Sequence, residues 1–99
     1  MLMITGSIRL PPDRLAAARP VMAAMIAASR AEAGCLGYSY AEDVIDPGLI
    51  RVCEQWIDLA ALEAHFQSDH IAVWRAAWPA LAICDRQLRR FTIDAGTPC

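Results

Sequence analysis

The sequence contains no lysine, and its nine basic side chains, all arginine, are outnumbered by eleven acidic ones. The formal net charge of −2 therefore produces only a weak field. Proteins that bind nucleic acids carry a strongly basic surface, so this composition argues against a nucleic-acid partner. Arg86, Arg89 and Arg90 do lie close together near the C-terminus. We interpret them as part of a solvated strand or a dimer edge, not as a phosphate site.

Closely spaced cysteines and long apolar runs are also absent. The four cysteines, Cys35, Cys53, Cys84 and Cys99, lack the paired spacing of a zinc or thioredoxin-like motif. No apolar run approaches the roughly 20 residues that span a bilayer, which argues against a membrane partner. The first residues lack the basic and apolar regions of a secretory leader. We therefore expect reduced thiols and a cytoplasmic location.

Apolar residues are abundant, because 57% of the chain is hydrophobic, against about 45–50% in a typical globular protein. A length of 99 residues suggests a single domain, whose surface is large relative to its core. We place this domain at residues 1–95 and a C-terminal tail at residues 96–99. The excess of apolar side chains indicates that a second copy covers part of the surface, so we expect a homodimer.

Alternation of apolar and polar residues predicts the strands of a half-buried sheet. We expect strands at residues 2–10, 36–45, 49–57 and 84–94. The Asp-Pro-Gly sequence at residues 46–48 predicts a tight turn, because proline presets its φ and glycine accepts a positive φ. Within the second predicted strand, Leu36, Tyr38 and Tyr40 are expected to share one face.

Helical spacing of apolar residues predicts three helices. We expect them between Pro12 and Gly34, at residues 59–67 and at residues 69–82. Pro20 lies inside the first helix and is expected to kink it near residues 16–20 or to delay its start. Asp58 is expected to cap the second helix, and Ser68 or Asp69 the third.

The order of these elements is βαβ–βαβ, with the second crossover helix split in two. Short strands, one tight hairpin and two right-handed crossovers predict an α+β, ferredoxin-like fold. In this fold a four-stranded antiparallel sheet carries its helices on one face. The other face then needs cover, which agrees with the expected homodimer.

Polar and aromatic residues gather where the third predicted strand leads into the helices. Glu54-Gln55-Trp56, Leu62-Glu63-Ala64-His65 and Ser68-Asp69-His70 bring a carboxylate, an indole and two imidazoles to one strand-to-helix corner. Gly34-Cys35-Leu36-Gly37-Tyr38 opens the second strand. These segments resemble the signature of the antibiotic biosynthesis monooxygenase family, which includes small quinol monooxygenases. The resemblance extends over nearly the whole chain.

The resemblance implies a dimeric α/β barrel, in which the sheets of two subunits pack face to face. It also implies a cofactor-independent monooxygenase, without metal or flavin, whose partners are a small aromatic substrate and O₂. Members of the family oxidise quinols or polycyclic phenols and anthrones, which give an electron to O₂ once they are deprotonated. Such chemistry requires a base, a donor for the growing oxyanion and a dry cavity.

Three residues are candidate catalytic groups. His65 is the candidate base, because imidazole titrates near neutral pH. Trp56 offers a flat ring and one N–H group, and Tyr40 offers a phenol that donates or accepts a proton. The expected lining of an apolar pocket between sheet and helices also includes Val52, Glu54, Phe66, His70 and Trp74.

Two positions depart from the polyketide-oxidising members, in which an asparagine, a tryptophan and a tyrosine are associated with catalysis. Trp56 matches the tryptophan, but Val52 stands at the asparagine position and Leu62 at the tyrosine position. Quinol-oxidising members keep histidines like His65 and His70. The resemblance to that branch is therefore the better one.

Haem and metal chemistry are not expected. Related haem-degrading proteins use a histidine where this chain has Arg75, and a tryptophan where it has His65. A metal site of His65 and His70 is not expected either, because they lie five residues apart across a helix break. The sequence also offers no apparent third ligand.

Structural interpretations of the same residues stay open. His65 could lie on a helix surface or contact a partner subunit, and His70 could contact the backbone or Glu54. Glu54 could be a buried acid, although an ion pair with an arginine is favoured. The tryptophans could all belong to the core. The apolar residues Val52 and Leu62 also fit a non-enzymatic protein that binds a small aromatic molecule. A third alternative is isomerase or lactone chemistry on the same barrel, without O₂.

Overall fold

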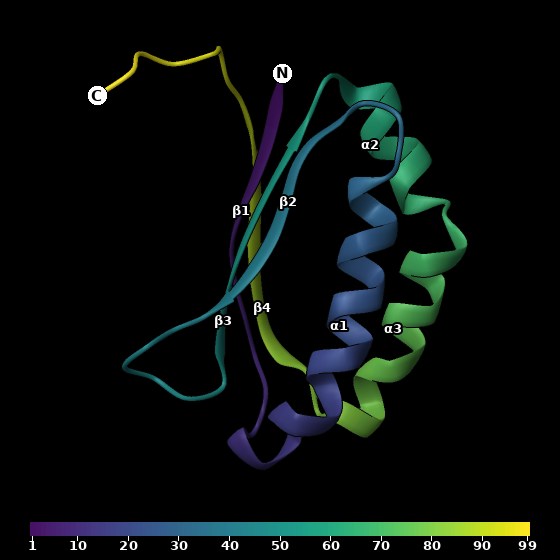
Figure 1. Cartoon of the computed structure of the whole chain (residues 1–99), viewed down its shortest axis with the longest axis vertical. Helices are drawn as coiled ribbons and strands as arrows, with labels where there is room; N and C mark the ends of the chain where they lie inside the picture. The colour runs from purple at the N-terminus through teal and green to yellow at the C-terminus, as the bar shows by residue number, and fades with distance from the viewer.

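The computed structural model describes all residues from 1 to 99 and contains one sheet covered on one face by helices (Figure 1). The elements in chain order are β1 (Leu2–Arg9), the 3₁₀ turn η1 (Pro12–Arg14), α1 (Leu15–Arg30), β2 (Cys35–Glu42), β3 (Leu49–Trp56), α2 (Leu59–Phe66), α3 (Asp69–Leu81) and β4 (Cys84–Thr92). The strands form one antiparallel sheet in the order β2-β3-β1-β4. The predicted α+β, ferredoxin-like fold is confirmed. Each helix is too short or too polar to span a lipid bilayer.

The helices begin where the sequence places their start signals. α1 begins at Leu15, directly after η1, and continues through Pro20. The late start that Pro20 was expected to cause is therefore not found, and its missing N–H leaves the carbonyl oxygen of Ala16 without its i→i−4 donor. Asp58 Oδ1 accepts a hydrogen bond from the backbone of α2, and Ser68 Oγ accepts one from the backbone of α3. Both caps agree with the sequence prediction.

β2 is shorter than predicted and differs at its start. It ends at Glu42, because Asp43 accepts two backbone hydrogen bonds from the turn that follows. Leu36 was expected to share the buried face of Tyr38, but it is 49% exposed. This prediction is wrong because the pairing of β2 with β3 shifts register just after Cys35. Such a shift moves the neighbouring side chain to the other face.

The core lies between the sheet and its helices. Alternate residues of β3 point into it, and Ile50, Val52, Glu54 and Trp56 are all buried. The residues between them point to the opposite face, where no helix packs (Figure 1). The helix layer therefore meets one sheet face only, and the candidate residues on that face lie beneath it.

Candidate active site

His65 is buried between α2 and the sheet, with 1% of its surface exposed. It follows Leu62 by one helical turn, and both side chains face the sheet. The His65 ring lies 4.6 Å from Trp56, 5.3 Å from Tyr38 and 5.9 Å from Phe66, centroid to centroid. The interpretation of His65 as a surface residue is therefore wrong. Its imidazole is surrounded by aromatic rings.

Glu32 is the main residue of the site that the sequence interpretation missed. It lies in the loop after α1, and its Oε2 atom is 2.5 Å from Nδ1 of His65. The same Oε2 lies 3.2 Å from Nε2 of His70. His70 was expected to contact the backbone or Glu54, but its nearest carboxylate is that of Glu32.

Gly34 explains how the loop reaches His65. Its φ of +82° is unfavourable for other residues, and a Cβ there would lie 2.7 Å from Ala61 and 2.8 Å from Ile57. Its carbonyl accepts a hydrogen bond from the N–H of Ile57. Gly34 thereby lets the loop lie against the start of α2, which places Glu32 beside His65.

The ionisation of His65 follows from these surroundings. Burial lowers the pKa of His65, and the hydrogen bond with Glu32 opposes this effect. In the neutral imidazole, Nδ1–H donates to the Glu32 carboxylate, so Nε2 keeps its lone pair. A neutral, oriented imidazole of this kind is able to accept a proton.

Glu54 is a buried carboxyl group on β3, only 4% exposed. Burial raises the pKa of Glu54 to about 7, although a hydrogen bond from Trp56 and the charge of Arg86 oppose this. The predicted ion pair of Glu54 with an arginine is not formed; the guanidinium of Arg86 instead lies over the Trp78 ring. Near neutral pH, Glu54 is therefore present as both acid and carboxylate.

Trp56 and the two tyrosines complete the polar groups. Trp56 is fully buried, and its Nε1–H donates to Oε1 of Glu54 at 3.1 Å. The indole N–H that was expected to donate at the site therefore already has Glu54 as its acceptor. Tyr38 and Tyr40 stack at 5.7 Å, and burial raises the pKa of both phenols. They stay protonated at neutral pH, so Tyr40 is suited to donate a proton, not to remove one.

A cavity of about 30 Å³ lies between the sheet and the helices α2 and α3. This is enough for a water molecule but far below the volume of an aromatic ligand site. Of the predicted residues, it is lined by Tyr40, Glu54, His65, Phe66 and Trp74. Val52, Trp56 and His70 do not line it. Tyr38 and Arg86 line it without having been predicted.

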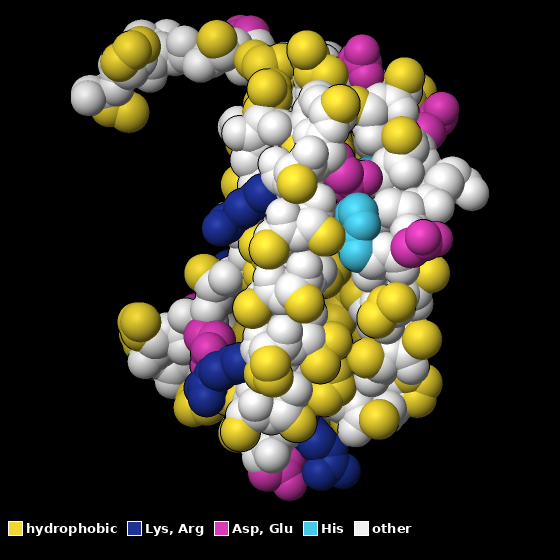
Figure 2. Space-filling view, turned by 45° about the vertical axis from the view of Figure 1, so that its right-hand side comes forward, with side chains coloured by type: hydrophobic (Ala, Val, Ile, Leu, Met, Phe, Trp, Pro, Cys, Tyr) yellow, Lys and Arg dark blue, Asp and Glu magenta, His cyan; other side chains and the backbone are white.

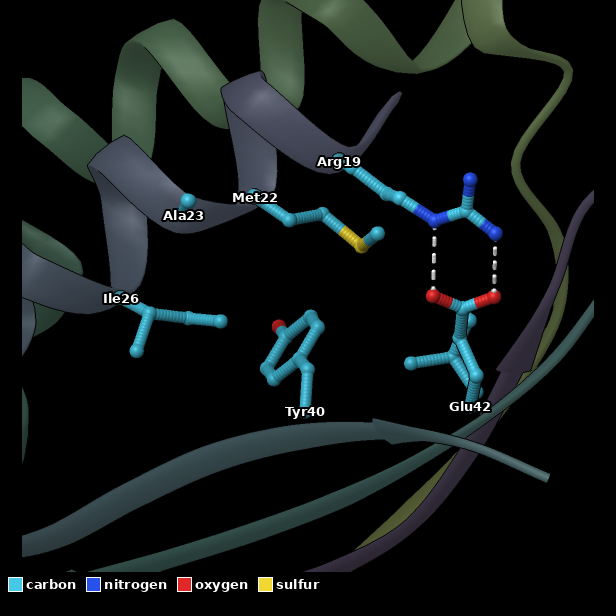
Figure 3. A pocket seen from close by; sticks show the side chains of 7 residues that line it. Arg19, Met22, Ala23, Ile26, Tyr40 and Glu42 are labelled. Atoms are coloured by element: carbon cyan, nitrogen blue, oxygen red, sulfur yellow. Dashed lines mark hydrogen bonds and ion pairs between the residues drawn. The ribbon is translucent and has the colours of Figure 1, made fainter. Parts of the chain in front are cut away.

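Two of the larger hollows each share one lining residue with this cavity. An apolar groove of about 450 Å³ between α1 and α3 is bordered by His70 and Trp74, and apolar side chains cover that region of the surface (Figure 2). A pocket of about 200 Å³ lies between α1 and β2. In this pocket Arg19 and Glu42 form a bidentate ion pair, with both N···O distances 2.9 Å. The ring of Tyr40 projects beside this pair (Figure 3). Trp74 borders both the groove and the small cavity.

Known proteins resemble this chain in sequence and in fold. The sequence profile described as antibiotic biosynthesis monooxygenase matches residues 1–77. The uncharacterised protein sll1783 of Synechocystis is 32% identical over 69 residues, which are 70% of this chain and 47% of that protein. The chain thus spans about half the length of this curated relative.

Solved structures match over almost the full length. PA3566 from Pseudomonas aeruginosa is 32% identical, with a TM-score of 0.82 and coverage of 95% of this chain and 94% of that one. A Deinococcus radiodurans protein, provisionally described as an antibiotic biosynthesis monooxygenase, has a TM-score of 0.91 at 23% identity. The match covers 100% of this chain and 98% of that one. At that identity the likeness shows the fold alone. With the profile match over residues 1–77, these similarities show that the chain belongs to the antibiotic biosynthesis monooxygenase family.

Proposed function

We propose that this protein is a cofactor-independent monooxygenase that oxidises a quinol or a related polycyclic phenol with O₂. The observation that carries the proposal is His65, a buried imidazole held by Glu32 at Nδ1 beside a cavity lined by aromatic rings and Glu54. Membership of the family supports the reaction class. The buried position supports the exclusion of water that a reactive peroxide needs.

The reaction balances without an added reductant, because the substrate supplies all four electrons. A quinol with one ring C–H and O₂ gives a hydroxyquinone and water. Nε2 of His65 accepts the phenolic proton, and the phenolate passes an electron to O₂. The two radicals combine into a peroxide anion on the ring carbon. Loss of the ring proton and cleavage of the O–O bond then leave a carbonyl group. The departing oxygen takes the ring proton and the proton held by Nε2 and leaves as water, which restores the neutral imidazole.

Two neighbouring groups are suited to stabilise the peroxide anion. Tyr40 stays protonated and lines the cavity, so its O–H is able to donate a hydrogen bond. Glu54 donates one when it is protonated, as it is in part near pH 7. Hydrogen-bond donors at developing negative charge are among the largest contributions to catalysis.

Substrate access is proposed through the groove between α1 and α3. Its volume of about 450 Å³ lies within the range of roughly 300–1,000 Å³ that small-molecule sites occupy. The cavity beside His65 is too small for a ring in the observed arrangement of side chains. Because Trp74 borders both spaces, a rotation of its ring would join them and admit a flat substrate.

Oxygen uptake by chelator-treated protein tests the proposal. With a panel of hydroquinones and anthrones, we expect at least one compound to consume one O₂ per molecule and to form the hydroxyquinone or the ketone. The uncatalysed autoxidation of each compound in the same buffer is the control. Rates equal to autoxidation across the panel would contradict an oxygenase.

A second candidate function is the binding of a small aromatic molecule without chemistry. It is favoured by Val52 and Leu62, which are buried core residues, 1% and 0% exposed. They leave the site without two polar side chains that the resemblance associates with polyketide oxidation. Quenching of tryptophan fluorescence by the same panel, without O₂ uptake, would favour this alternative.

We also propose that a second copy of the chain covers the open face of the sheet. On that face Met3 pairs with Phe91, which is 47% exposed, and Thr5 pairs with the exposed Cys53. Light scattering of the unmodified protein should give twice the mass of one chain. Cys53→Arg places a charge on this face, so this variant should have the mass of a single chain. A single-chain mass for the unmodified protein at micromolar concentration would contradict the homodimer.

A further inference from the structure

Glu32, His65 and His70 form a cluster of potential metal ligands. They come from three parts of the chain, the loop after α1, the helix α2 and the first turn of α3. One ligand atom from each residue lies within 4.8 Å of the other two. The third ligand that the sequence did not reveal is therefore supplied by the fold.

The nitrogen of His70 gives the second observation. Its Nε2 is shielded from solvent and makes no hydrogen bond, although it lies 3.2 Å from Oε2 of Glu32. Nδ1 of His65 approaches the same oxygen from its own side. Two imidazole nitrogens thus converge on one carboxylate oxygen, and only one of them makes a hydrogen bond. A buried polar atom without a partner is unusual, since its desolvation is uncompensated.

The distances suit a small cation. Zinc binds histidine and carboxylate ligands at about 2.0–2.2 Å, so its tetrahedral ligand atoms lie roughly 3.4 Å apart. The distance of 3.2 Å between Oε2 of Glu32 and Nε2 of His70 is already close to this value. No two ligand atoms of the cluster are more than 4.8 Å apart, so side-chain shifts of about 1.4 Å or less would reach the tetrahedral spacing. The N-terminus of α3 contributes an unfavourable positive potential, which the carboxylate of Glu32 offsets.

We propose that Glu32, His65 and His70 bind a divalent transition-metal ion, with Zn²⁺ the ion best matched to their donor atoms. Two imidazoles and one carboxylate are a known ligand set for zinc and for other first-row metals, and they leave an open coordination position. His70 also borders the groove between α1 and α3, which gives the ion a path from solvent.

Metal binding and the proposed oxygenation exclude each other at His65. A metal bound at Nδ1 replaces the proton that now forms the hydrogen bond to Glu32. The remaining imidazole proton then lies on Nε2, so Nε2 no longer acts as a base. Zn²⁺ would therefore inhibit the oxygenase, and chelation would restore it. Binding itself does not depend on the oxygenase, so it is measured without substrate.

The test is a Zn²⁺ titration of chelator-stripped protein in competition with a chromophoric chelator. The exposed thiols Cys53, Cys84 and Cys99 are changed to serine in every sample, because they would bind zinc themselves. We expect one Zn²⁺ per chain. Glu32→Gln and His70→Gln should each weaken binding by about 100-fold or more, since each removes a direct ligand. Glu63→Gln, an exposed neighbour on α2, should bind like the parent.

A second readout keeps the result independent of folding. Zn²⁺ should raise the melting temperature of the parent and of Glu63→Gln, but not of the two ligand variants, whose far-UV circular dichroism should be native. Co²⁺ should give a visible spectrum of nitrogen and oxygen ligation without thiolate bands. Unchanged affinity in Glu32→Gln and His70→Gln, or no binding by the parent, would overturn the site whatever the oxygen-uptake assay shows. If a ligand variant is misfolded, His70→Asn takes its place.

Discussion

Replacement of His65 by glutamine is expected to lower substrate-dependent O₂ uptake by roughly 100- to 10,000-fold, the usual contribution of a general base. Glutamine retains polarity and approximate size inside the aromatic surroundings of His65. It has no nitrogen lone pair that accepts a proton at neutral pH. Steady-state rates of metal-free protein, with the circular dichroism and melting temperature of each variant, would measure the effect. Turnover within threefold of the parent would contradict a base at position 65.

Glu32→Gln tests whether the base needs its orienting carboxylate. An amide is able to donate its N–H to Nδ1, which puts the imidazole proton on Nε2 and leaves the wrong tautomer for proton abstraction. We expect kcat to fall by about 100-fold, with KM little changed, and Glu32→Asp to recover part of the loss. Glu63→Gln is the matched control and should be unaffected. A purely structural role of Glu32 would change stability without this split between kcat and KM.

The pH dependence provides a further check on His65. Because burial lowers its pKa, kcat/KM should rise with pH through a midpoint below the ordinary value of 6.5. This rising limb should be missing in His65→Gln, whatever residual activity that variant keeps. An unchanged limb in the variant would assign the titration to another group.

Much of the fold follows from short-range patterns in the sequence. Alternation within β3 predicted which of its residues are buried, and the Asp58 cap predicted the start of α2. These features depend on neighbouring residues alone, so periodicity and capping rules capture them. Leu36 was predicted wrongly because a register shift depends on the pairing strand, which periodicity does not describe.

The site was predicted less completely, because its contacts join distant parts of the chain. Glu32 lies 33 residues before His65, and only the approach of the Gly34 loop to α2 brings them together. The sequence offered one signal for it, since Glu32 stands just before the Gly34-Cys35 segment that carries the resemblance. Trp56 was predicted as a pocket residue from its strand face and from its match to the tryptophan of the resembling family. That face is shared by core and pocket, and packing decides between them.

Glu54→Gln is expected to stabilise the protein at alkaline pH. The pKa of Glu54 is raised from its ordinary value of 4.5 to about 7 by burial. Between these two values, the native state holds a proton that the unfolded chain has lost, so the free energy of unfolding falls as pH rises. The decrease ends above about pH 7. Glutamine does not titrate, and its carbonyl oxygen still accepts the hydrogen bond from Trp56.

The advantage of Glu54→Gln should therefore be small near pH 4.5 and reach on the order of 2–3 kcal/mol at pH 8. Urea unfolding of parent and variant between pH 5 and 8.5 would measure it, with Glu63→Gln as the control for charge removal at an exposed site. The activity profile gives an independent outcome. Neutral Glu54 is proposed to donate to the peroxide, so parent activity should fall above about pH 7, whereas the variant, whose amide still donates, should keep its rate. Parallel stability curves for parent and Glu54→Gln would show that this carboxyl group titrates normally in the folded protein.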